Sequence, residues 1–142
     1  MKKLTLFFVI FLMSTLSFAQ DYQDFVGKWT GTGENGGEKG IFLIIKQEGN
    51  SIKLEFPDNP AWRAEFHNIR IEDGVLKFEQ INYSKDNSFK EKYGKDHPYS
   101  GVVNYCEMWK DKNGKMLFRI WTDYMKGEPP IEVTKLNESL SE

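Results

Sequence analysis

The chain has 142 residues and a formal net charge of −2 at pH 7. A length of this order is typical of a single domain. The near-neutral charge differs from the clustered basic surface of proteins that bind nucleic acid, so we predict no nucleic-acid partner. Because Cys106 is the only cysteine, no intrachain disulfide can form, and the fold depends on packing.

The first nineteen residues predict a secretory signal peptide. Lys2 and Lys3 form a basic start, residues 4–16 are nearly all apolar, and residues 17–19 place small side chains at the two positions that signal peptidase reads. The apolar run is shorter than the ~20 residues that a membrane-spanning helix needs. We therefore predict no membrane span, export to the periplasm or extracellular space, and a mature domain over residues 20–142.

The rest of the chain shows little helical periodicity and is typical of short strands separated by turn signals. Residues 41–45 form a dense apolar run, whereas apolar and charged residues alternate over 52–56 and 62–67, as in half-buried strands. The expected strands cover residues 28–33, 41–45, 52–56, 62–67, 76–79, 102–109, 116–122 and 131–136.

Short turns join most of these strands. Asp73-Gly74 and Asn113-Gly114 are sequences that favour tight β-hairpins. Sequential strands with short links form a meander, which avoids exposed edges by closing into a barrel. The expected fold is all-β: an antiparallel up-and-down barrel of about eight strands, with a two-sheet sandwich as the alternative.

Two stretches need separate interpretation. Residues 84–99 are too polar for a central strand and long for a hairpin loop, so they form either a flap over the barrel mouth or a solvated surface loop. Residues 31–36 match the spacing of a dinucleotide-binding glycine string. That chemistry needs a following helix, whereas an apolar strand is expected next. We predict a hairpin there and no cofactor.

The start of the mature chain resembles lipocalins and other calycins. Gly27-Lys28-Trp29 is similar to the Gly-x-Trp signature of their first strand, and residues 122–124 (TDY) are similar to a triplet near a late loop. The resemblance, which extends to compact lipocalin-like proteins secreted by bacteria, implies a ligand-binding barrel with Trp29 as a structural plug at one end and Gly27 allowing close approach beneath it. The family packs an arginine over this tryptophan, a place that Lys135 or Arg119 would take here.

No catalytic or metal-binding motif is present. The two histidines, His67 and His97, do not pair at metal-ligand spacing, and no zinc or serine-hydrolase string occurs. Cys106 is expected to be a buried apolar residue on a strand. We therefore predict no catalytic residues, no metal and no cofactor.

The hairpin over 102–122 decides which side chains face inward. A turn of two or four residues would place Glu107 inside the barrel as a buried carboxylate that needs a partner. Its companions on that face would be Tyr105, Trp109, Met116, Phe118 and Ile120. In the opposite assignment, the inward residues are Cys106, Met108, Leu117 and Trp121, with Arg119 among them. We favour the first assignment.

These observations predict a secreted, non-catalytic protein that holds a small, largely apolar molecule inside a barrel. The expected pocket walls are Trp62, Phe66, Phe78, Tyr105 and Phe118, with Glu107 as the polar contact. One alternative is a surface or accessory domain with a filled barrel, which binds a macromolecule, or a second copy as a homodimer, through exposed aromatics. A second alternative is a small secreted enzyme of unrecognised type.

Overall fold

The computed structural model describes residues 22–31 and 40–137. The predicted signal peptide, nearly all of the glycine string at 31–36 and the last five residues lie outside the described residues.

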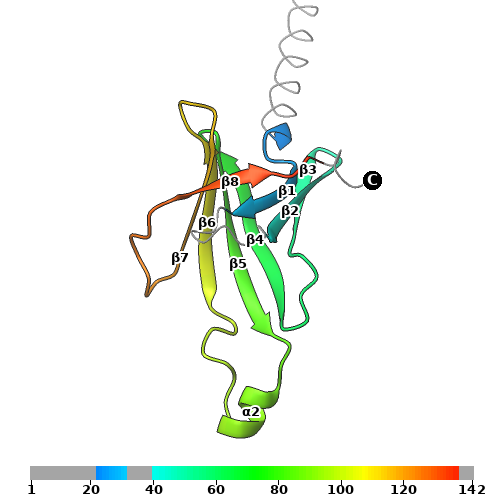
Figure 1. Ribbon diagram of the computed structural model, residues 1–142, viewed down its shortest axis with the longest axis vertical. Helices are drawn as coiled ribbons and strands as arrows, with labels where there is room; N and C mark the ends of the chain where they lie inside the picture. Colours follow the sequence, from blue (N-terminus) through cyan, green and yellow to red (C-terminus); the bar gives the residue numbers. More distant parts are fainter. Residues whose placement is uncertain (1–21, 32–39, 138–142) are drawn as a thin grey trace, which may run out of the picture.

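Eight strands and almost no helix make up the described part of the chain, as predicted (Figure 1). The strands are β1 (Gly27–Gly31), β2 (Ile41–Glu48), β3 (Ser51–Glu55), β4 (Trp62–Glu72), β5 (Val75–Ser84), β6 (Val103–Lys110), β7 (Met116–Trp121) and β8 (Ile131–Lys135).

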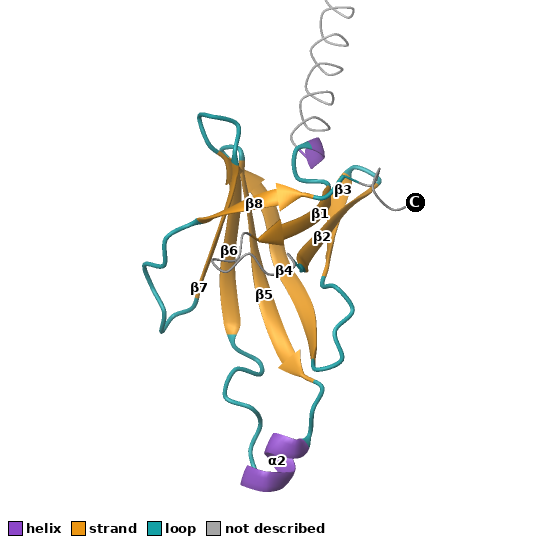
Figure 2. Ribbon diagram, viewed as in Figure 1, coloured by secondary structure: helices purple, strands orange, loops and turns teal. Residues whose placement is uncertain are grey.

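All strands belong to one antiparallel sheet with the order β3-β2-β1-β8-β7-β6-β5-β4. The end strands β3 and β4 approach each other without pairing, so the barrel is nearly closed. This single sheet replaces the sandwich alternative and is compatible with a calycin-like fold. Strands β4 to β7 reach farther down than the other four strands (Figure 2). We call that end the mouth, and the opposite end, which carries the β6–β7 hairpin, the closed end.

A buried core fills the closed end. Trp29 is 3% exposed, and its Nε1 donates a hydrogen bond to the carbonyl of Phe25 at 2.7 Å. Lys135, not Arg119, lies over this ring, with Nζ 5.2 Å from the ring centroid. Gly27 has a φ of +148°, and a Cβ there would lie 2.9 Å from the Lys135 side chain. The glycine therefore leaves room for the lysine stem that covers the tryptophan.

The β4–β5 connection is a hairpin, as predicted, and its turn has two residues. Glu72 pairs with Val75 across it, and Asp73 and Gly74 have φ values of 51° and 75°. Positive φ at both turn residues is the type I′ geometry, which matches the twist of the flanking strands.

The β6–β7 connection corrects the predicted turn length. The Asp111 amide donates to the Lys115 carbonyl and the Gly114 amide to the Asp111 carbonyl, which leaves a three-residue loop. The Asp111 carboxylate accepts the amides of Asn113 and Lys115, and Gly114 takes a φ of 81°, so the turn closes with one additional residue.

A loop with an odd number of residues shifts the pairing of the two strands by one residue relative to a loop with an even number, so different side chains share a face. Glu107 is opposite Arg119, whereas Cys106 is opposite Ile120. Both predicted assignments of the inward face were therefore wrong in part. The buried residues of the two strands are Cys106, Met108, Met116 and Phe118.

The stretch 84–99 contains a short helix that the sequence did not predict, α2 (Ser88–Tyr93). The Asp86 carboxylate accepts hydrogen bonds from the amide and hydroxyl of Ser88 at the start of the helix. Gly94 ends it in the left-handed conformation, with a φ of 69°. This connection projects beyond the mouth of the barrel (Figure 1).

Candidate binding site at the barrel mouth

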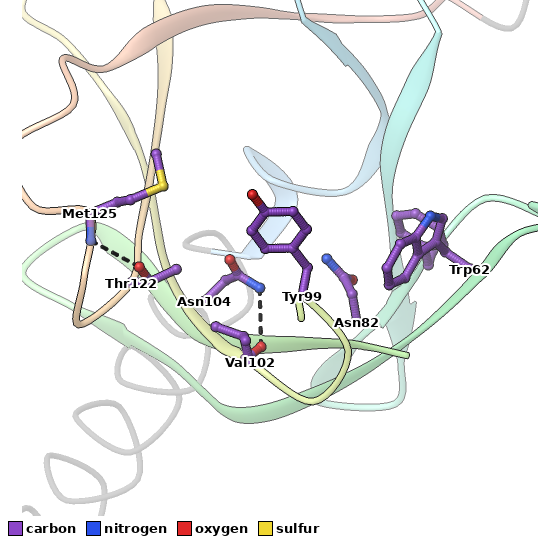
Figure 3. Close-up of a pocket in the computed structure, with 8 residues that line it drawn as sticks. Trp62, Asn82, Tyr99, Val102, Asn104, Thr122 and Met125 are labelled. Carbon is purple, nitrogen blue, oxygen red and sulfur yellow. Dashed lines mark hydrogen bonds between the residues drawn. The ribbon is translucent and has the colours of Figure 1, made fainter. Parts of the chain in front are cut away.

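A cavity of about 320 Å³ opens at the mouth. Its volume lies near the lower limit of small-molecule sites, which is roughly 300 Å³. No charged side chain is among the residues that line it. These residues are Phe56, Trp62, Asn82, Tyr99, Val102, Asn104, Thr122 and Met125 (Figure 3).

The cavity begins where the inward residues change from apolar side chains to amides. On β5, buried Phe78 is followed on the same face by Gln80 and Asn82. On β6, buried Cys106 is preceded on its face by Asn104. Asn82 and Asn104 line the cavity and form its floor, and buried Gln80 lies beneath them.

The floor amides form a small hydrogen-bonded group. Gln80 Nε2 donates to Asn82 Oδ1 at 2.8 Å. Asn104 Nδ2 donates to the carbonyls of Gln80 and Val102 at 3.1 and 3.3 Å. These contacts use one polar atom each of Asn82 and Asn104. The other atoms, Asn82 Nδ2 and Asn104 Oδ1, have no partner among the described residues and are directed toward the cavity (Figure 3).

An aromatic group forms one side of the rim. The ring of His97 lies 5.2 Å from that of Trp62, edge to face, and 5.6 Å from that of Tyr99. The Tyr99 amide donates to His97 Nδ1 at 3.2 Å. On the other side, Asn59 Oδ1 accepts the amide of Trp62 at 3.0 Å and holds the start of β4. The connection after β5 thus packs against β4 through His97.

The opposite side of the rim is a turn that follows β7. Thr122 Oγ1 accepts hydrogen bonds from the amides of Tyr124 and Met125, and the Thr122 amide donates to the Met125 carbonyl. This turn places the Met125 side chain over the cavity (Figure 3). The triplet at 122–124 singled out from the sequence therefore lies at the rim.

A second groove of about 340 Å³ follows the gap between β3 and β4. Phe56 and Trp62 line both this groove and the cavity at the mouth, so the two openings meet at these residues. Lys85 Nζ donates to the Asn59 carbonyl at 2.7 Å beside the groove.

The predicted apolar wall residues divide between the cavity and the core. Trp62 lines the cavity, and Phe66 lines the neighbouring groove. Phe78 and Phe118 are 2% and 5% exposed, with ring centroids 6.4 Å apart, and belong to the filled core below the floor.

The two remaining predicted residues lie on the outer face of the barrel. Tyr105 stacks on Trp121, with ring centroids 5.9 Å apart. Glu107 accepts a hydrogen bond from Arg119 and has Lys77 Nζ 4.0 Å away. The odd β6–β7 loop is the reason, because it turns the face of Glu107 and Tyr105 outward.

The amides of the floor were missed by the sequence analysis. Gln80, Asn82 and Asn104 occupy alternate positions at which strands otherwise carry buried apolar residues. Amides at inward positions of two strands that pair were the signal that could have identified the site.

Cys106 is not part of the site. It is 1% exposed, and burial raises the pKa of its thiol well above the usual range, so the thiol stays protonated. Over residues 22–31 and 40–137, no group of His, Cys, Asp and Glu is placed to hold a metal ion. Within those same ranges, no helix is both long and apolar enough to cross a bilayer.

Comparison with known proteins gives no match: no family model, curated protein or solved structure is significantly similar to this chain.

Proposed function

We propose that this protein binds a small, uncharged molecule in the mouth of its barrel, without chemistry on the ligand. The observation that carries the proposal is a cavity of about 320 Å³ with apolar walls and two unpaired amide atoms at its floor. Binding sites for small molecules are typically apolar with a few placed polar groups.

The lining indicates what kind of ligand fits. Trp62, Val102 and Met125 offer apolar surface, which favours an apolar body. The absence of charge among the lining residues favours a neutral ligand, because a charged group would lose its hydration without gaining an ion pair. The ligand predicted from the sequence was largely apolar, and the floor amides add a polar edge to it.

The resemblance of Gly27 and Trp29 to the lipocalin signature supports the same proposal, because that family consists of ligand-binding barrels. The signal pattern of residues 1–19 supports an exported protein. Amino-terminal sequencing of the protein from its host tests export, which predicts a chain that starts at Gln20.

Two neighbouring valines provide the test. Val102 lines the cavity, whereas the next residue, Val103, points outward in the strand. We expect the neutral fluorophore N-phenyl-1-naphthylamine to brighten with the wild-type protein and with Val103→Trp, but not with Val102→Trp, which fills the cavity. Met125→Glu, at the exposed rim, serves as a second variant that leaves the core intact and should also weaken binding.

Far-ultraviolet circular dichroism checks that each variant folds. Equal brightening with both tryptophan variants and with Met125→Glu would place the fluorophore elsewhere and overturn the proposal. No brightening with the wild-type protein would do the same. If the proposal holds, native mass spectrometry of the protein purified from its host would identify any natural molecule that occupies the cavity.

A further inference from the structure

Given the proposed function, on which this inference rests, we infer the chemical class of the ligand. The geometry points to a planar, uncharged heterocycle that carries a carbonyl next to an N–H group, as in a lactam. The polar edge would meet Asn82 and Asn104, and the flat faces would lie beside Trp62 and Tyr99.

The acceptor at the floor has a defined orientation. Asn104 Nδ2 donates to two backbone carbonyls, of Gln80 and Val102, and a carbonyl can only accept. Turning the amide over would lose both hydrogen bonds and bring three oxygens together. Asn104 Oδ1 is therefore the atom that remains available, and it would accept the N–H of a ligand.

The donor comes from the neighbouring strand. Asn82 Oδ1 accepts the hydrogen bond of Gln80 Nε2, which leaves both hydrogens of Asn82 Nδ2 for a ligand carbonyl. Gln80 pairs with Asn104, and Asn82 lies two residues farther along β5 on the same face. Such diagonal neighbours are about 7–8 Å apart at Cα, so their side chains can meet one ligand edge. A donor and an acceptor side by side are complementary to an adjacent carbonyl and N–H.

The aromatic rim offers space for a flat ring. Trp62 and Tyr99 line the same cavity, and each contacts the ring of His97, at 5.2 and 5.6 Å. They make no ring contact with each other in the described structure. Trp62 and Tyr99 are therefore separate ring surfaces of one cavity, and a planar ligand that lies against them gains the offset or edge contacts that aromatic groups prefer.

The same walls disfavour a sugar. A pyranose carries hydroxyl groups around its whole edge, and each hydroxyl buried without a partner costs free energy. Phe56, Val102 and Met125 supply no strong hydrogen-bond partner from their side chains. A heterocycle with one polar edge leaves no such group unpaired.

Quinazolin-4(3H)-one is a probe with this edge, and its second ring nitrogen, N1, is an acceptor that the methyl control below shares. Its 3-methyl derivative lacks the N–H, and naphthalene has the same bicyclic size without polar atoms. Titrations followed by tryptophan fluorescence and calorimetry should give a dissociation constant at least about tenfold lower for quinazolinone than for either control. Methyl β-glucopyranoside, which tests the sugar, should not bind detectably.

Asn82→Asp tests the donor, because it replaces the amide nitrogen with a second acceptor of the same shape. It should weaken quinazolinone at least about tenfold and leave naphthalene unchanged. Asn113→Asp, the same change on an exposed turn, is the matched control and should alter neither.

The outcomes separate the two proposals. Equal affinity for quinazolinone and its methyl derivative, or tighter binding of the glucoside, would overturn the ligand class. The proposed binding site at the mouth would still hold in that case, provided that Val102→Trp abolishes the binding of naphthalene. If no probe, including N-phenyl-1-naphthylamine, responds to Val102→Trp, both proposals are wrong.

Discussion

The closed end and the mouth of this barrel share strands β4 to β7 but differ in the type of side chain that faces inward. At the closed end the inward positions carry large apolar groups such as Phe78 and Met108, at 2% and 0% exposure. Toward the mouth, β5 carries Gln80 two positions after Phe78, and β6 carries Asn104 four positions before Met108, with Cys106 between them. The pairing of β5 with β6 continues without a register shift across this boundary, whereas β4 has a bulge between His67 and Arg70. The comparison shows that strands which pair regularly, β5 and β6, can line a filled half and a hollow half when their inward side chains change from apolar groups to amides.

Removing a ring from the filled half should have the largest effect. Phe78→Ala leaves a cavity beside Phe66 and Phe118, whose rings contact it. We expect a loss of about 3–5 kcal/mol in the free energy of unfolding, measured by urea denaturation. Phe89→Ala, on the half-exposed helix α2, is the matched control and should cost far less. Equal losses would mean that the filled half is not the stabilising one.

The plug at the closed end should come next. Trp29→Phe removes the indole nitrogen, which leaves the Phe25 carbonyl without its 2.7 Å hydrogen bond, and it also removes ring area under Lys135. A loss of about 2 kcal/mol is expected from the buried unpaired carbonyl and the smaller ring. Thermal unfolding followed by circular dichroism measures it. An unchanged midpoint would show that the plug does not stabilise this end.

A substitution in the three-residue β6–β7 loop should have a smaller effect on the free energy of unfolding. Gly114 has a φ of 81°, which is strained for any residue with a Cβ, so Gly114→Ala should cost about 1 kcal/mol. Gly40→Ala has open space around the new methyl group and no positive φ, and it should be nearly neutral. Chemical denaturation compares the two. Similar values would argue against the three-residue loop that turns Glu107 outward.

The hollow half should tolerate truncation. Trp62 is half-buried at the rim, so Trp62→Ala should cost less than about 1 kcal/mol in unfolding free energy while it weakens binding of N-phenyl-1-naphthylamine. A loss as large as that of Phe78→Ala would show that the mouth is packed core instead of a site.

The smallest effect concerns charges on the outer surface, which spans both halves. Hydrogen bonds from Lys46, Arg63 and Arg70 lower the pKa values of Glu55, Glu65 and Glu72, respectively, below the ordinary 4.5. A carboxylate with a lowered pKa adds stability above its unfolded pKa and loses it as the pH falls through the folded value.

Stability should therefore decline slightly as the pH falls from about 5 to below 4. These groups are exposed, so 1 M salt should flatten the decline. Urea denaturation at a series of pH values checks this. A rise in stability on acidification would reverse the sign and contradict the ion pairs.

Alternation of apolar and polar residues, together with turn residues, was sufficient to predict about eight strands, an antiparallel meander and a hairpin turn at Asp73-Gly74. The strands and the hairpin turn depend on local contacts, which the order of residues already contains, whereas the single sheet also needs β1 to pair with β8 from the other end of the domain. The outer positions of Tyr105 and Glu107 were not predictable in this way. One residue more or less in a loop inverts the faces of everything that follows it, and the sequence Asp111–Lys115 permits more than one loop length.

The cavity was decided only by tertiary structure. Trp62, Tyr99, Asn104 and Met125 come from separate strands and loops, and only the closing of the sheet brings them together. Alternation in the sequence places Asn82 and Asn104 on the inward face, but it does not show which of their atoms stay unpaired. The neighbouring strand decides this, because it supplies one of the carbonyls that hold Asn104 and leaves the Asn104 oxygen facing the cavity.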